Sequence, residues 1–169
     1  GFANRAAAVV ERGYMVTDKR FLPDLSQLTY GQMRNAILGL DVRVSSALLP
    51  DRTYGLYDES KRLILIDRRM TYTRKRCTLM HELVHWLHGD QTCTGVIGNR
   101  HERRTRLETA RRLISPLEYA TAETIWDGKP GLIAGELNVT QEIVEDYRSM
   151  LHDMIPHERE KALHGAATP

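Results

Sequence analysis

Hydrophobic and polar positions alternate in three short segments of the first half of the chain. Valines alternate with arginine and serine over residues 42–46, a spacing that predicts a half-buried strand. Two further strands are predicted at 53–57 and 62–66, and the residues between them, 58–61, are typical of a hairpin turn. These segments predict a small antiparallel sheet, and the continuously apolar run Leu63–Ile66 predicts its central strand.

Most of the remaining chain has apolar residues at helical spacing. This periodicity predicts helices at 2–12, 30–38, 73–88, 101–114, 117–126, 131–137 and 140–151. The helix at 73–88 has Thr71 or Thr73 as its N-cap, and Gly89 ends it. Residues 89–100 are rich in glycine and threonine and are predicted to form a loop. We therefore expect an α+β fold, in which the small sheet packs on the helices at 73–88 and 101–114.

The helix at 73–88 contains His81-Glu82-Leu83-Val84-His85. Histidines four residues apart project from one face of a helix, so both rings can bind one tetrahedral Zn²⁺ at about 2.0–2.1 Å each. Glu82 lies beside such a metal rather than on it, where it can accept a proton from a water molecule whose pKa the metal lowers to about 7. Because the motif is surrounded by apolar residues, it indicates a buried site rather than a solvated helix face with two surface histidines.

A third protein ligand has to come from another part of the chain. His88 follows the motif, but a histidine at the end of a helix is more often stabilised by the negative C-terminal dipole. The remaining candidates are Glu102 and Glu108 on the next predicted helix. They lie about 600° apart around a helix, so they face opposite sides and cannot both bind the metal.

The stretches 77–85 and 101–114, with the loop that joins them, resemble the ImmA/IrrE family of metallopeptidases. In that family a glutamate near the start of the second helix supplies the third ligand, and here it corresponds to Glu102. Thr105 stands where the family usually has alanine, and Leu113-Ile114 matches the end of the family pattern. The resemblance thus favours Glu102 over Glu108.

This resemblance implies a function as well as a site. A zinc-dependent metallopeptidase is expected, with Zn²⁺ held by His81, His85 and Glu102 and with Glu82 as the catalytic base. Its expected substrate is a regulatory protein such as a transcriptional repressor, cleaved in the derepression of a phage or other mobile element or in a stress response. A substrate strand is expected to add to the sheet edge along residues 52–57.

The break at Asp127–Pro130 predicts a boundary between two parts of the chain. Residues 1–126 form the predicted zincin-like metallopeptidase domain, and residues 127–169 form a helical segment that resembles a helix-turn-helix and ends in a polar tail after Pro156. In a DNA-binding unit of this kind the second helix carries basic or amide side chains to the bases. Here it carries Glu142, Glu145 and Asp146, which would repel phosphates, so we expect protein docking or packing instead of DNA binding.

Composition excludes some classes of protein. The apolar fraction of 41% and the charged fraction of 27% are ordinary for a globular protein, and the net charge of +2 is too small to indicate nucleic acid. No apolar run approaches the roughly 18 residues that a membrane span needs. Cys77 and Cys93 do not make a disulfide framework, which favours a reducing, cytoplasmic environment, and Cys77 is expected to be buried beneath the site. The alternative function is a DNA-binding or repressor-partner protein whose metal site is structural or inactive.

Overall fold

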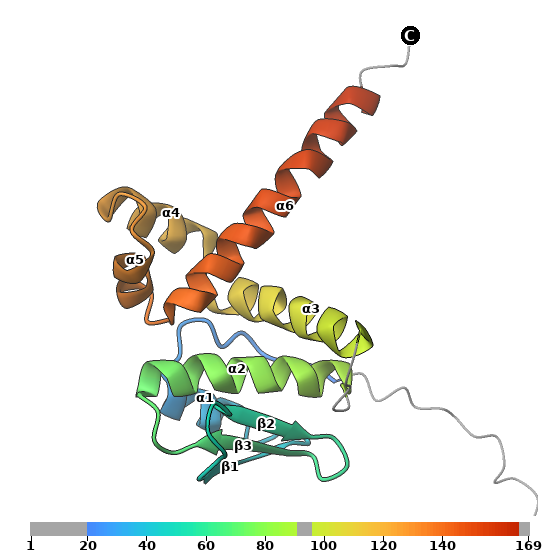
Figure 1. Ribbon diagram of the computed structural model, residues 1–169, viewed down its shortest axis with the longest axis vertical. Helices are drawn as coiled ribbons and strands as arrows, with labels where there is room; N and C mark the ends of the chain where they lie inside the picture. The colour runs from blue at the N-terminus through green and yellow to red at the C-terminus, as the bar shows by residue number, and fades with distance from the viewer. Residues whose placement is uncertain (1–19, 91–95, 166–169) are drawn as a thin grey trace, which may run out of the picture.

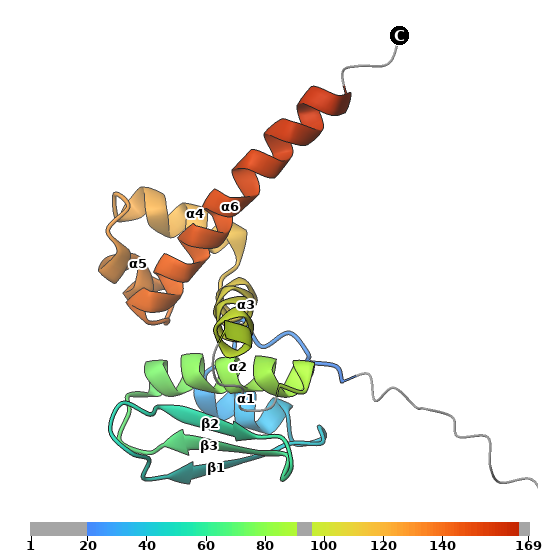
Figure 2. The same cartoon turned by 45° about the vertical axis from the view of Figure 1, so that its right-hand side comes forward.

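A computed structural model describes residues 20–90 and 96–165. The predicted helix at 2–12 and Cys93 lie outside the described residues. The elements are α1 (Tyr30–Ala36), β1 (Arg43–Ala47), β2 (Gly55–Asp58), β3 (Leu63–Asp67), α2 (Tyr72–His88), α3 (Val96–Leu113), α4 (Pro116–Ile125), α5 (Pro130–Glu136) and α6 (Gln141–Gly165). The sheet lies against α2, α3 crosses the other side of α2, and α6 leads away from this layered body (Figures 1 and 2). The fold is α+β, as expected.

The sheet has the order β1-β3-β2, with β3 in the centre. β2 pairs antiparallel with β3, and the Asp58 side chain closes the turn between them by accepting from the Lys61 backbone N–H at 3.1 Å. β1 pairs parallel with β3, so the expectation of a wholly antiparallel sheet is wrong in this respect. The reason is that β1 and β2 lie on opposite sides of β3 and run in opposite directions, so only one of them can be antiparallel to β3. β3 is buried between them, with Ile64 and Ile66 inaccessible to solvent.

Local signals set both ends of α2, the helix that carries the histidine motif. The Thr71 side chain accepts a hydrogen bond from the Arg74 backbone N–H at 3.3 Å, which satisfies one of the free donors of the first turn. Gly89 ends the helix in the left-handed conformation at φ 64°, which glycine adopts without steric cost. The apolar face of α2 packs on the sheet and on α1, so the motif lies on a rigid, buried helix.

Two helices extend beyond the ranges expected from the sequence. α3 begins at Val96 rather than at residue 101, because a helix can include a glycine such as Gly98 at a cost of only about 1 kcal/mol. α6 continues through Pro156 to Gly165, where a polar tail was expected. A proline removes one helical hydrogen bond and bends the helix, but α6 continues past it. No helix among the described residues is long and apolar enough to cross a membrane.

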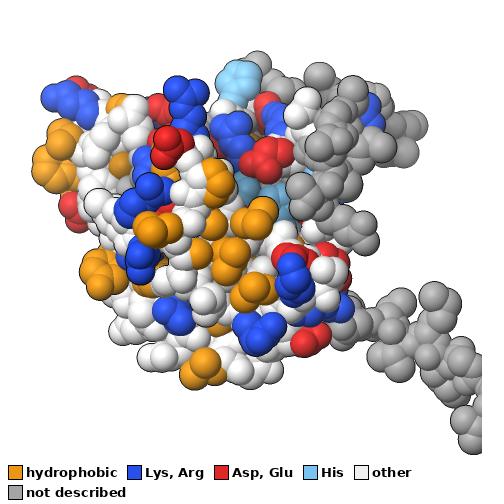
Figure 3. Space-filling model, turned by 60° about the horizontal axis from the view of Figure 1, so that its bottom comes forward, with side chains coloured by type: hydrophobic (Ala, Val, Ile, Leu, Met, Phe, Trp, Pro, Cys, Tyr) orange, Lys and Arg blue, Asp and Glu red, His pale blue; other side chains and the backbone are white. Residues whose placement is uncertain are grey.

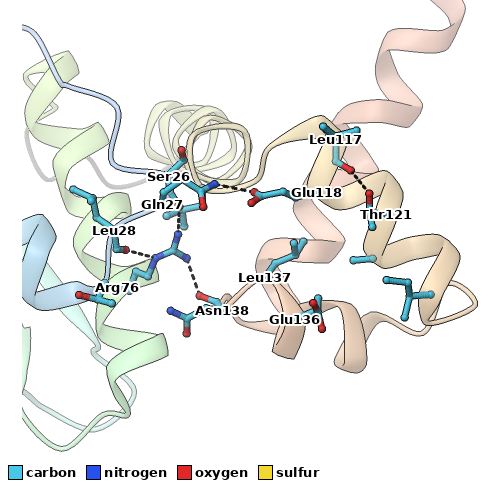
Figure 4. A pocket seen from close by; sticks show the side chains of 14 residues that line it. Ser26, Gln27, Leu28, Arg76, Leu117, Glu118, Thr121, Glu136, Leu137 and Asn138 are labelled. Atoms are coloured by element: carbon cyan, nitrogen blue, oxygen red, sulfur yellow. Dashed lines mark hydrogen bonds between the residues drawn. The ribbon is translucent and has the colours of Figure 1, made fainter.

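The C-terminal helices are attached to α2 through Arg76, which is almost completely buried. Its guanidinium donates to the carbonyl oxygens of Leu28 at 2.8 Å, of Asn138 at 2.7 Å and of Ser26. Figure 4 shows these three bonds converging on one side chain, beside a cavity of about 410 Å³. Arg76 therefore connects α2 to the segment before α1 and to the turn between α5 and α6.

Candidate metal centre

Two histidines from α2 and one glutamate from α3 converge where the helices cross. The Nε2 atoms of His81 and His85 lie 3.1 Å apart. Glu102 places Oε1 3.3 Å from Nε2 of His81 and Oε2 3.5 Å from Nε2 of His85. Ligands at about 2.0–2.1 Å from a tetrahedral zinc ion are separated from one another by about 3.3 Å. The observed separations are close to this value, with a different Glu102 oxygen facing each imidazole, so the three side chains are positioned to hold one small cation.

A second carboxylate orients one of the two imidazoles. Asp90 places Oδ2 3.0 Å from Nδ1 of His85, and a carboxylate oxygen only accepts. Nδ1 of His85 therefore carries the hydrogen, and the lone pair on Nε2 points to the centre of the cluster. Arg104 also donates to Asp90, and the backbone N–H of Asp90 donates to the His85 carbonyl at 3.0 Å.

Reasoning from the sequence did not identify Asp90. Its position directly after Gly89 could have identified it, because the left-handed turn at that glycine returns the chain to the last turn of α2. Thr105 approaches the same nitrogen, with its hydroxyl 3.5 Å from Nδ1 of His85. Thr105 and Thr109 are inaccessible to solvent, and as small side chains they allow α3 to pack closely on α2.

The other candidate ligands lie elsewhere. Glu108 places Oε2 2.6 Å from Nε2 of His88 and accepts a hydrogen bond from Nε of Arg112 at 2.8 Å. It therefore lies on a different face of α3 from Glu102. Cys77 is buried in the core, and this burial raises the pKa of its thiol. His101, which precedes Glu102 on α3 and was not predicted as a ligand, places Nδ1 3.6 Å from Oδ1 of Asp90.

Glu82 lies next to the histidines and directly beneath β2. Its side chain is almost fully buried, and burial raises the pKa of its carboxyl, although the neighbouring His81 and His85 act in the opposite direction. A Cβ atom at Gly55 would lie 2.7 Å from Oε1 of Glu82 and 2.5 Å from Cγ2 of Thr78. Only glycine lets the strand approach this closely, so the backbone of β2 lies against the carboxylate of Glu82.

The charges of the cluster favour a cation between the three side chains. Hydrogen bonds from His81 and His85 hold the pKa of Glu102 far below its ordinary value, although burial acts the other way. Burial lowers the pKa of His85, but the hydrogen bonds to Glu102 and Asp90 outweigh burial and raise it overall. A positive charge at this point, from a proton or a metal ion, is therefore stabilised by the carboxylates around it.

The cluster opens into a cavity of about 480 Å³. β2 and the residues before it form one wall, and the first turns of α6 form another, with Thr140, Ile143 and Asp146. Figure 3 shows histidine and acidic side chains next to apolar ones on this side of the molecule. The cavity beside Arg76 lies apart from this chemistry and shares no lining residue with it.

Comparison with known families agrees with this geometry. Residues 36–149, more than half of the chain, match the family of the IrrE N-terminal-like domain, a peptidase family. The matched range includes the sheet, α2, α3 and the first turns of α6. No curated protein and no solved structure gives a match. The chain therefore belongs to the peptidase family of the IrrE N-terminal-like domain, whose metallopeptidase character implies a metal ion.

Proposed function

We propose that this peptidase is zinc-dependent and that His81, His85 and Glu102 hold the metal. The observation that carries the proposal is the convergence of the three side chains: the two Nε2 atoms lie 3.1 Å apart, and a carboxylate oxygen of Glu102 lies 3.3 Å from one and 3.5 Å from the other, close to the spacing of zinc ligands. Two imidazoles and one carboxylate are also a typical ligand set of catalytic rather than structural zinc, because they leave the fourth position free.

Glu82 is the proposed general base. When bound, the metal would lower the pKa of water and polarise the carbonyl of the scissile peptide bond. Glu82 accepts the proton of the attacking water and then delivers it to the leaving amine. Its burial supports this role, since a carboxyl with a raised pKa holds a proton better during transfer.

The free edge of β2 is the proposed binding surface for the substrate main chain. The Tyr54 carbonyl accepts from the backbone N–H of Asp67 at 2.9 Å, so Tyr54 directs its backbone groups toward β3. Alternate residues of a strand point to opposite edges, and Thr53, Gly55 and Tyr57 therefore face the free edge. A substrate strand pairing with Gly55 would bring its peptide bonds next to Glu82.

We infer a protein substrate, and we propose a transcriptional repressor in the cytoplasm because of the resemblance to the ImmA/IrrE family. Direct DNA binding through α6 is not expected. Glu142 lies 3.2 Å from Arg74, and Asp146 accepts from Arg106, so the acidic face of α6 packs against the peptidase body. That face is neither basic nor free to enter a DNA groove.

Metal analysis combined with a cleavage assay tests the proposal. Purified protein is stripped with a chelator, reloaded with Zn²⁺ and incubated with a candidate repressor and with a mixed peptide library, in parallel with Glu82→Gln. Both proteins should retain about one zinc per chain, and only the wild type should cleave. If both bind zinc and neither cleaves the repressor or any peptide of a mixed library, the alternative of a binding protein with a structural metal site is favoured.

A further inference from the structure

Three arginines line the cavity that opens from the cluster of His81, His85 and Glu102. Two of them form ion pairs with acidic side chains of α6. Arg74 lies 3.2 Å from Glu142, and Nε of Arg106 lies 3.1 Å from Asp146. The third, Arg52, makes no ion pair with any acidic side chain of the described residues. Among residues 20–90 and 96–165, the cavity therefore contains one arginine whose charge no acidic side chain balances.

The other acidic groups of the cavity do not change this balance. Glu82 and Glu102 are the two remaining carboxylates of the lining, and both face the histidine cluster. A divalent cation in the cluster would offset their two negative charges. Arg52 would then leave a net positive charge in the cavity, which favours an anionic group on the substrate.

Arg52 is also placed where a bound strand would pass. It is exposed and lies just before β2, at a turn that requires the left-handed conformation, φ 65°. Non-glycine residues in this conformation are strained and are frequent at binding sites. Two residues, Thr53 and Tyr54, separate Arg52 from Gly55, so the backbone positions of the two lie at most about 10 Å apart.

We propose that the peptidase selects substrates with an aspartate or glutamate about three residues from the scissile bond, an inference that rests on the proposed function. Arg52 is the residue that binds this acidic side chain. A guanidinium recognises a carboxylate with two parallel hydrogen bonds, which makes it more selective than a lysine at this position. Because Arg52 lies on one side of Gly55, the acidic residue is expected on one side of the bond only.

A peptide library of defined composition tests this. The zinc-loaded wild type is incubated with a mixture of synthetic peptides, and the cleavage products are sequenced by mass spectrometry. We expect aspartate and glutamate to be enriched about fivefold, two to four residues from the cleaved bond and on one side, as suits a partly exposed ion pair. Arg52→Gln should remove the enrichment, and Arg52→Glu should replace it with enrichment of lysine and arginine.

Arg43→Glu is the matched control, because Arg43 is an exposed arginine on β1, at the opposite edge of the sheet. It should retain the wild-type preference. Cleavage without acidic enrichment, or an unchanged preference in Arg52→Glu, would overturn the role of Arg52 while leaving the proposed function intact. If zinc-loaded wild type cleaves neither the candidate repressor nor any peptide of the library, the proposed function fails, and the inference about Arg52 fails with it. If it cleaves only the repressor, at a bond with no acidic residue within four positions, the role of Arg52 alone is overturned.

Discussion

The two halves of α2 both bury polar side chains, but they satisfy them in different ways. In the N-terminal half, Arg76 donates to three backbone carbonyls, so its hydrogen-bonding groups are used within the fold. In the C-terminal half, His81 and His85 point Nε2 at each other and at Glu102, and all three are groups that bind a cation. One half holds the fold together, whereas the other half supplies two ligands of the proposed metal site.

This difference predicts which property each half controls. Arg76 bonds only to backbone carbonyl oxygens, which every residue has. Its hydrogen bonds therefore stabilise the fold and form no site made of particular side chains. The partners of His81 and His85 are side chains from a separate helix, and α3 must pack correctly on α2 to bring them together. Substitutions in the first half should therefore change the free energy of unfolding, and those in the second half should change metal affinity.

The largest effect is expected for His81→Ala or His85→Ala. Each leaves two protein ligands, which hold zinc poorly, so most of the bound metal should be lost. Zinc content after dialysis, measured by inductively coupled plasma mass spectrometry, reports this directly. Stoichiometric zinc in either variant would show that the two imidazoles are not ligands.

Arg76→Met should lower the free energy of unfolding by about 3 kcal/mol, because three carbonyls in a buried region lose their donor. Urea denaturation measures the change. Arg103→Met is the control, since Arg103 is exposed and pairs only with Asp153, and it should cost less than about 1 kcal/mol. Equal effects of both substitutions would remove the proposed distinction between the halves of α2.

Glu102→Gln should weaken zinc binding at least tenfold, since an amide oxygen carries no charge for the metal. Competition with a chelating indicator gives the Kd. Glu108→Gln is the matched control on the same helix, and it should leave the Kd nearly unchanged because Glu108 pairs with His88 and Arg112. A larger effect at Glu108 would mean that α3 lies in a different register against α2.

Asp90→Asn tests the orientation of His85 and should weaken zinc binding by about tenfold. The asparagine retains the shape of the side chain but can present an N–H to Nδ1, which would permit the wrong tautomer of the imidazole. Asp153→Asn, at an exposed ion pair on α6, serves as a control for the loss of one negative charge. Equal zinc affinity of Asp90→Asn and wild type would show that Asp90 does not orient His85.

Much of the fold follows from local patterns. The N-cap at Thr71, the stop at Gly89 and the hairpin turn at 58–61 depend on residues close in sequence, and the structure has all three. The parallel direction of β1 depends on the edge of β3 to which it pairs, and the periodicity of a single strand does not encode that edge. α3 begins earlier than the glycine- and threonine-rich composition of residues 89–100 predicts, because composition describes local propensity, whereas packing decides where a helix begins.

The candidate site divides in the same way. The sequence alone determined that His81, Glu82 and His85 share one region of a buried helix, because 3.6 residues per turn put positions i and i+4 on one face. Spacing left Glu102 and Glu108 open and the resemblance favoured Glu102, but only the tertiary structure shows Glu102 beside the histidines. It alone shows that Asp90 orients His85 and that, within the described part of the chain, Arg52 is the cavity arginine without an acidic partner. Such choices depend on how α3 and α6 pack on α2, and packing is a balance of contacts between residues far apart in the chain.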